Sequence, residues 1–233
     1  MNIIITGATK GIGRAITDAF AAEGCNLAIC ARTAIDLDTY KKELKSKFSD
    51  IQVLTKVVDM SKKDQVLAFT DYIKSQWDRV DVLVNNAGVY LPGEVHKEED
   101  GILEHQINTN LYSAYHMTRG IIPLMLDKAQ GHIFNMCSIA SLIALPGGGS
   151  YSISKFALLG FSKVLREEMK DKGVKVTSIM PGATWSASWT GIELPEDRLM
   201  QAKDIADAVL GAWKLGPSAV VEEIVIRPQL GDL

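Results

Sequence analysis

The stretch that decides the fold is "NIIITGATKGIGRAI", residues 2–16, where a short apolar run leads through a glycine-rich turn into a helical pattern. Gly7, Gly11 and Gly13 permit a sharp turn and let backbone N–H groups come close to a ligand at the positive end of the helix. A pyrophosphate group suits such a turn. The spacing is G-x-x-x-G-x-G, and taken alone it is also compatible with a plain tight connection between strand and helix.

Short apolar runs rich in β-branched residues alternate along the chain with amphipathic stretches of helical length. We expect strands at Ile3–Thr6, Leu27–Ala31, Val53–Val58, Val82–Asn85, Ile133–Met136, Val174–Met180 and Ile224–Ile226, and helices at Gly13–Glu23, Ala34–Lys47, Lys63–Trp77, Leu103–Leu126, Tyr151–Lys170 and Lys203–Trp213. The near-continuous apolar runs indicate strands that are buried on both faces. The predicted fold class is therefore α/β, a single-domain Rossmann fold with a doubly wound parallel sheet of about seven strands and helices on both faces.

The end of the second predicted strand, "ICARTA" at residues 29–34, indicates which dinucleotide is bound. In this fold an acidic side chain there meets a free ribose 2′-hydroxyl, whereas arginine accommodates a 2′-phosphate. Arg32 occupies that place, and Lys10 of the first loop supplies a second cation nearby. The sequence predicts that NADP(H) is preferred over NAD(H), unless both residues are ordinary solvated surface charges.

Residues 1–233 are expected to form one NAD(P)-binding Rossmann domain, because no repeat or long linker interrupts the alternation. The least regular segment, "ATWSASWTGIELPEDRLM" at residues 183–200, follows the sixth predicted strand. It is a candidate substrate lid over the edge of the sheet where ligands bind. Trp185 and Trp189 either form a wall over the substrate or pack the segment down.

The composition argues against several other classes of protein. With 233 residues and 47% hydrophobic content the chain can bury a core, and its formal net charge of −3 offers no basic surface to nucleic acid or to a membrane. Its opening residues are far too short an apolar run for a signal peptide or a span. Cys25, Cys30 and Cys137 lack paired spacing, which indicates reduced thiols and a cytoplasmic location. The four histidines have no metal-ligand spacing, so we expect no metal.

Motifs along essentially the whole chain resemble those of the short-chain dehydrogenase/reductase family. They are "TGATKGIG" at 6–13, "DM" at 59–60, "NNAG" at 85–88, Asn110 within "INTNLYSAYHM", Ser138 within "NMCSIAS", Tyr151 and Lys155 as Tyr-x-x-x-Lys, and "PG" at 181–182. Their order and spacing are those of the family. The chain is most similar to bacterial 3-oxoacyl-[acyl-carrier-protein] reductases and to sepiapterin or carbonyl reductase-like members.

The resemblance implies a set of residues that bind the cofactor. Those in the glycine-rich loop and at the end of the second strand are Gly7, Thr9, Lys10, Gly11, Ile12, Gly13, Arg32 and Thr33. Asp59 and Met60 would border the adenine. The ribose side would be lined by Asn86, Ala87 and Gly88. The nicotinamide half would be bound by Tyr151, Lys155, Pro181, Gly182 and Thr184, with Thr184 at the carboxamide.

The predicted chemistry is reversible reduction of a ketone to a secondary alcohol, which requires a hydride at carbon and a proton at oxygen. Tyr151 can supply that proton, because Lys155, one helical turn away, stabilises the phenolate. The resemblance adds that Lys155 hydrogen-bonds the nicotinamide ribose, that Ser138 polarises the carbonyl and that Asn110 holds a water linked to Lys155. Taken singly, the same side chains are also compatible with a packed ring, a snorkelling ammonium and local polar bonds.

Two departures from the family pattern leave the substrate open. Ser186 stands where many relatives have threonine, and the ending "EEIVIRPQLGDL" lacks the Val-Asp-Gly-Gly type of ending common among the acyl-carrier reductases. We therefore expect a small-molecule or carrier-bound carbonyl substrate. The first class is a 3-oxoacyl thioester, the alternative a sepiapterin-type or general carbonyl compound. A non-catalytic NADP(H)-binding regulator is the alternative from another class. In related proteins helices equivalent to 103–126 and 151–170 form the main subunit contact, which predicts a homodimer or homotetramer.

Overall fold

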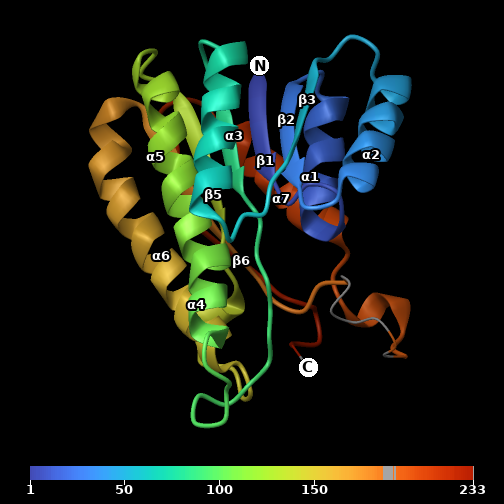
Figure 1. Ribbon diagram of the computed structural model, residues 1–233, viewed down its shortest axis with the longest axis vertical. Coiled ribbons are helices and arrows are strands. Elements are labelled where there is room, and N and C mark those ends of the chain that lie inside the picture. The colour runs from blue at the N-terminus through green and yellow to red at the C-terminus, as the bar shows by residue number, and fades with distance from the viewer. Residues whose placement is uncertain (186–190, 192, 233) are drawn as a thin grey trace.

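All the predicted apolar runs form strands of one sheet in the computed structural model, which describes residues 1–185, 191 and 193–232 (Figure 1). The strands are β1 (Asn2–Thr6), β2 (Asn26–Ala31), β3 (Val53–Val57), β4 (Val82–Asn85), β5 (Gly131–Met136), β6 (Val174–Pro181) and β7 (Glu223–Ile226). Their order across the sheet is β3-β2-β1-β4-β5-β6-β7, and each neighbouring pair is parallel. The predicted doubly wound parallel sheet is confirmed.

Helices cover both faces of this sheet (Figure 1). One face carries α1 (Gly11–Ala22), α2 (Ala34–Lys47) and α7 (Ala202–Trp213), and the other carries α3 (Lys63–Gln76), α5 (Ser113–Leu126) and α6 (Gly149–Met169). Ile3 and Ile5 of β1 pack into the first core and Ile4 into the second, and all three are fully buried. Because successive strand side chains point to opposite faces, two cores require the continuous apolar runs seen in the sequence.

The helix predicted over Leu103–Leu126 is divided into three parts. Helix α4 (Ile102–Ile107) begins after Gly101, which adopts a left-handed conformation with φ of 93°, and the π-helical turn η1 (Asn108–Tyr112) joins it to α5. A π-turn contains one residue more than an α-turn and often occurs at functional sites. Here it brings Asn110 against the loop that follows β4.

Two other predicted helix boundaries are off by two residues. Helix α1 begins at Gly11 rather than Gly13, and α6 begins at Gly149 rather than Tyr151. Glycine is a poor helix former, so the sequence pattern places both starts too late. Tyr151 consequently lies within the first turn of α6, separated from the glycines only by Ser150. No helix among the described residues has both the length and the apolar character needed to cross a bilayer.

The connectivity fixes where a ligand can bind. From β1 the chain runs outward through β2 and β3, then crosses to β4 on the other side of β1. The loops that follow β1 and β4 therefore diverge, and folds of this type bind ligands in the resulting crevice at the carboxyl ends of the strands.

Candidate active site

A cavity of about 460 Å³ lies at this divergence. Its walls come from the loops after β1, β2, β3 and β4 and from the first turns of α6. The predicted residues that line it are Gly7, Thr9, Lys10, Gly11, Ile12, Gly13, Arg32, Thr33, Asp59, Met60, Asn86, Ala87, Gly88, Tyr151 and Lys155. Pro181, Gly182, Thr184, Ser138 and Asn110 are not among its lining residues.

A larger cavity of about 810 Å³ opens at the amino ends of the strands, away from these residues. Several of its cationic side chains already have partners within the protein: Arg166 pairs with Glu222 at 3.0 Å, and Lys175 donates to the carbonyl of Gly216 at 2.7 Å. The smaller cavity is the candidate site, because it lies at the topological switch point.

The glycine-rich loop is tied to the loop after β4 by the side chain of Asn86. Its amide donates to the carbonyl of Thr6 at 2.9 Å and to that of Gly7 at 3.2 Å, while the hydroxyl of Thr6 accepts from the backbone N–H of Asn86 at 3.0 Å. Gly7 is left-handed with φ of 66°, and a Cβ at Gly13 would overlap both the Gly7 carbonyl oxygen and the Asn86 amide nitrogen. Glycine at both positions is therefore required by the closeness of the two loops.

The N-terminus of α1 is suited to an anion. Lys10, the N-cap residue, makes no side-chain capping bond, and nothing lies within 4 Å of a Cβ built on Gly11. The first N–H groups of a helix lack intrahelical partners and lie at the positive end of its dipole. A pyrophosphate would satisfy them, so the residues present fit the dinucleotide that the family implies.

Charged side chains surround the part of the cavity that lies next to the end of β2. Arg32 is exposed, and Lys10 pairs with Asp36 at 3.0 Å. Burial opposes ionisation of Asp59, but hydrogen bonds from Ser61 and the charge of Arg32 outweigh it, so the pKa of Asp59 lies below its ordinary value. Arg32 is thus close enough to Asp59 to act on its charge, and it lines the cavity.

Tyr151 and Lys155 lie one turn apart on α6. The ammonium of Lys155 is 5.7 Å from the centre of the Tyr151 ring and donates a 2.8 Å hydrogen bond to the carbonyl of Met136 at the end of β5. Lys155 is only 5% exposed. Because a buried ammonium needs polar partners, the Met136 carbonyl holds this charge beside the phenol. Tyr90 packs edge to face on Tyr151, with ring centres 4.8 Å apart.

Asn110 is held by the loop after β4. Its side-chain oxygen accepts from the N–H of Val89 at 2.8 Å, and its amide donates to the Val89 carbonyl at 3.0 Å and to the Ser154 hydroxyl at 2.8 Å. A Cβ on Gly88 would lie 3.2 Å from this side-chain oxygen and 3.5 Å from the Lys155 ammonium. Asn110 therefore joins the loop to α6 close to Lys155.

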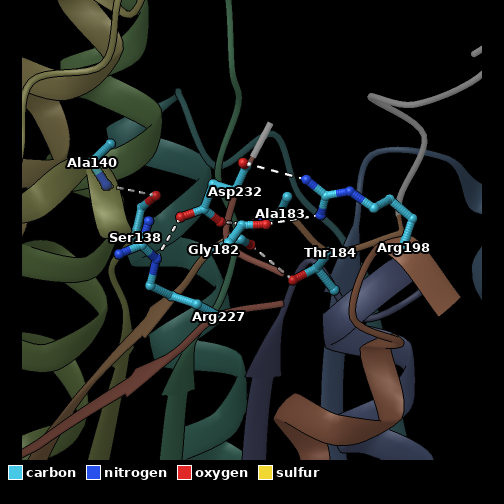
Figure 2. A network of polar contacts seen from close by, with 9 residues as sticks. Ser138, Ala140, Gly182, Ala183, Thr184, Arg198, Arg227 and Asp232 are labelled. Atoms are coloured by element: carbon cyan, nitrogen blue, oxygen red, sulfur yellow. Dashed lines mark hydrogen bonds and ion pairs between the residues drawn. The ribbon is translucent and has the colours of Figure 1, made fainter. Parts of the chain in front are cut away.

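Ser138 lies at the carboxyl edge of the sheet, two residues after the end of β5. Its hydroxyl accepts from the N–H of Ala140 at 3.1 Å and caps the short helix η2 (Ile139–Ser141). The hydroxyl of Thr184 donates to the carbonyl of Gly182 at 3.0 Å. Figure 2 draws both contacts, together with a network of polar contacts around Asp232.

Asp232 is the centre of that network (Figure 2). One carboxylate oxygen accepts from the N–H of Ala183 at 2.7 Å, and the other accepts from Arg227 at 2.7 Å. Arg198 donates to the carbonyl of Gly231 at 2.8 Å. A Cβ on Gly182 would overlap the Asp232 carboxylate. The tail after β7 thereby fixes the segment that leads into the predicted lid.

Several lining residues are missed by the sequence reasoning. They are Asp36, Val58, Val89, Tyr90, His105 and Thr109, with Ala31 at the end of β2. His105 and Thr109 are one helical turn apart, and Thr109 directly precedes Asn110 in the motif, which is a signal that could have indicated both. Of the lid residues singled out above, Trp185 donates its backbone N–H to Met200 at 2.9 Å, while Ser186 and Trp189 lie outside the described residues.

Comparison with known proteins places this geometry in a family. The family model for short chain dehydrogenase matches residues 1–196. Sepiapterin reductase of Chlorobaculum tepidum is 32% identical over 239 aligned residues, which cover 99% of this chain and 97% of that protein. An uncharacterized oxidoreductase of Staphylococcus saprophyticus is 28% identical, over 97% of this chain and 96% of its own length.

Solved structures match along nearly the whole chain. The alcohol dehydrogenase of the archaeon Thermococcus sibiricus, complexed with 5-hydroxy-NADP, has a TM-score of 0.89 and 26% identity, with 98% of this chain and 96% of that one covered. L-Sorbose reductase of Gluconobacter frateurii, complexed with NADPH and L-sorbose, has a TM-score of 0.90 and 25% identity, with 97% and 95% covered. Since the family model spans most of the sequence and a 32% identical relative aligns almost end to end, the chain belongs to the short-chain dehydrogenase/reductase family of oxidoreductases.

Proposed function

We propose that this chain is an NADPH-dependent carbonyl reductase that reduces a ketone to a secondary alcohol, with Tyr151 as the acid. One observation carries the proposal: Tyr151 and Lys155 line the same cavity as the glycine-rich loop and Arg32. A cation suited to a 2′-phosphate therefore lies at one end of the cavity and a phenol beside an ammonium at the other. The NADP(H) ligands of the similar solved structures support the choice of cofactor.

When bound, the reduced nicotinamide supplies the hydride to the carbonyl carbon. Tyr151 gives its phenolic proton to the developing alkoxide, and the Lys155 ammonium stabilises the phenolate that remains. Ser138 polarises the carbonyl, which requires its hydroxyl to donate to the substrate while it accepts from Ala140. Asn110 keeps the loop after β4 against Lys155 and holds the water that connects the ammonium with solvent.

Two candidate substrate classes are each favoured by a different similarity to known proteins. A 3-oxoacyl thioester is the first candidate, from the motif resemblance. A sepiapterin-type or other small carbonyl compound is the second, and it is favoured by the 32% identical sepiapterin reductase that aligns with 99% of this chain. A non-catalytic NADP(H)-binding regulator would have no use for an acid at position 151.

The test is consumption of NADPH over a panel of 3-oxoacyl thioesters, pterins, sugars and simple ketones, with the wild type and Tyr151→Phe. We expect turnover by the wild type, and a loss of kcat of at least about 10²-fold in the variant, since general acid catalysis contributes about 10²–10⁴-fold. NADPH should still bind to Tyr151→Phe, as followed by its fluorescence. Substantial remaining kcat contradicts the role of Tyr151. Tight binding of NADPH without turnover of any panel member favours the regulator.

Two further features belong to the proposal. Large apolar side chains on η1, α5 and α6 are exposed, among them Tyr112 at 48%, Phe156 at 46% and Val164 at 58%. A second copy of the chain covering them would form a homodimer or homotetramer, which light scattering after gel filtration measures. Residues 183–200 would act as the lid, since the bridge between Thr184 and Met200 joins its two ends.

A further inference from the structure

The loop between β4 and α4 is anchored on the first turn of α6. The N–H of Gly93 donates to the carbonyl of Gly147 at 2.8 Å, and Gly93 forms a parallel bridge with Gly148. Glu98 completes the attachment with both carboxylate oxygens. One accepts from the backbone N–H of Ser150 at 2.9 Å, and the other accepts a short hydrogen bond from the Ser150 hydroxyl.

Helix α6 needs such a partner because its own N-cap cannot provide one. Gly148 is the N-cap residue, and no local side chain makes a capping hydrogen bond there. The first N–H groups of a helix have no intrahelical acceptor, and a carboxylate near them is favoured by the helix dipole. Glu98 supplies this cap from 52 positions earlier in the chain.

Two glycines make room for the side chain of Glu98. A Cβ on Gly149 would overlap one of its carboxylate oxygens, and a Cβ on Gly93 would lie 2.7 Å from its Cγ atom. The two glycines thus allow the side chain to reach Ser150. Hydrogen bonds from the Ser150 hydroxyl and backbone hold the pKa of Glu98 below its usual range. The cap is therefore charged at neutral pH.

The attachment lies directly beside Tyr151. Tyr151 follows Ser150 directly, and Tyr90, from the beginning of the same loop, packs edge to face on its ring at 4.8 Å. The loop therefore contacts the turn that carries the phenol at both of its ends. Glu98 is not among the lining residues of the 460 Å³ cavity.

We propose that Glu98 is a positioning residue for Tyr151. From the loop between β4 and α4, Glu98 caps α6 and so fixes the position and orientation of the phenol. This inference rests on the acid role proposed for Tyr151. Misplacement of a catalytic group by about 1 Å can cost about 100-fold in rate. Loss of the cap should therefore appear in kcat, while binding of NADPH is preserved.

The first experiment compares Glu98→Ala, Glu98→Gln and Ser150→Ala with the matched control Glu99→Gln, which removes the neighbouring exposed carboxylate. We expect kcat to fall by about 10- to 100-fold in Glu98→Ala. Ser150→Ala should lose less, because the backbone N–H contact remains. The Kd for NADPH should stay within about twofold of the wild type in all four variants, and Glu99→Gln should behave as the wild type.

The second experiment does not depend on turnover. The protein is labelled with 3-fluorotyrosine, and the ¹⁹F resonance of position 151 is assigned by its loss in Tyr151→Phe. Glu98→Ala should shift that resonance and leave the resonance of Tyr40, which is buried at the opposite face of the sheet, unchanged. If the wild type reduces no ketone, the proposed function fails, and this resonance still decides the positioning role.

Wild-type kcat in Glu98→Ala, or an unmoved resonance of position 151, overturns the inference. So does a parallel loss of kcat and NADPH affinity, which would indicate a general loss of structure. Thermal melting identifies a variant that does not fold. If Glu98→Ala does not fold, the positioning role is tested with Glu98→Gln and Ser150→Ala instead, by kcat and by the ¹⁹F resonance of position 151.

Discussion

Replacing Gly13 with alanine adds a methyl group where the glycine-rich loop meets the loop after β4. The new Cβ would overlap the Gly7 carbonyl oxygen and the Asn86 amide nitrogen, and it would lie 3.0 Å from the Gly7 carbonyl carbon. The Gly7 backbone lies on one side of the methyl group and the hydrogen-bonded Asn86 amide on the other, so the methyl group cannot move away from both. Either the loops separate or the Asn86 amide gives up its bonds to Thr6 and Gly7.

The size of the effect follows from these contacts. Overpacking costs about 1–3 kcal/mol, and the two hydrogen bonds of the Asn86 amide contribute about 1 kcal/mol each. Alanine recovers about 1 kcal/mol over glycine within a helix. The free energy of unfolding should therefore decrease by about 2–4 kcal/mol. For a chain of 233 residues this lowers Tm by roughly 5–15 °C.

Thermal and urea denaturation measure this loss, with Gly211→Ala as the control. Gly211 also lies in a helix, α7, but nothing lies within 4 Å of a Cβ built on it. That variant should gain about 0.5–1 kcal/mol, because only the helix preference of alanine acts there. If both variants melt within about 2 °C of each other, the close approach of the two loops does not constrain position 13.

Three further predictions concern single side chains. Arg32→Ala should lower kcat/KM with NADPH by about 10- to 100-fold, because a charged hydrogen bond to phosphate contributes about 1.5–3 kcal/mol. The kcat/KM with NADH should stay almost unchanged. Equal losses with both cofactors would contradict this role of Arg32. Burial lowers the pKa of His132 to about 3. Below about pH 6.5 the unfolded chain therefore binds a proton at His132 and the folded chain does not. As the pH falls below that value, the free energy of unfolding should decrease by about 1.4 kcal/mol per pH unit. Urea titrations between about pH 5 and 7.5 should show that slope, and an equally steep slope in His132→Gln would exclude His132 as its source. Asp232→Ala should speed hydrogen exchange at the Ala183 amide by about 10- to 100-fold, because that N–H loses the carboxylate that accepts from it at 2.7 Å. An unchanged exchange rate would mean that the tail after β7 does not hold the segment around Ala183.

The sheet could be predicted from the sequence because burial on two faces leaves a direct trace in composition. Ile3, Ile4 and Ile5 must all be apolar if both cores use β1, and the same holds for the other interior strands. Helix starts are less well determined. Gly11 and Gly149 are poor helix formers that lie in first turns, where the helix leaves N–H groups to other partners.

The site could be predicted only as far as its motifs are local. The glycine loop, Arg32 and the Tyr151–Lys155 pair lie where spacing along a strand end or a helix face puts them. Tyr90 packs on Tyr151 and Glu98 bonds to Ser150 across distant segments of the chain, and no local pattern records such pairings. Ser138 and Thr184 carry the right motifs but are not among the residues that line the cavity, and spacing along the chain does not reveal this.

The π-turn at Asn108–Tyr112 has a consequence for how the length of this helix can vary. One extra residue changes the helical phase by about 100°, so the segment that carries His105 and Thr109 is out of phase with α5. A single deletion there would restore an uninterrupted α-helix, with better backbone bonding, and would swing both side chains away from the cavity wall. Loops often absorb such a change in length, whereas a deletion in this helix would alter the wall of the cavity.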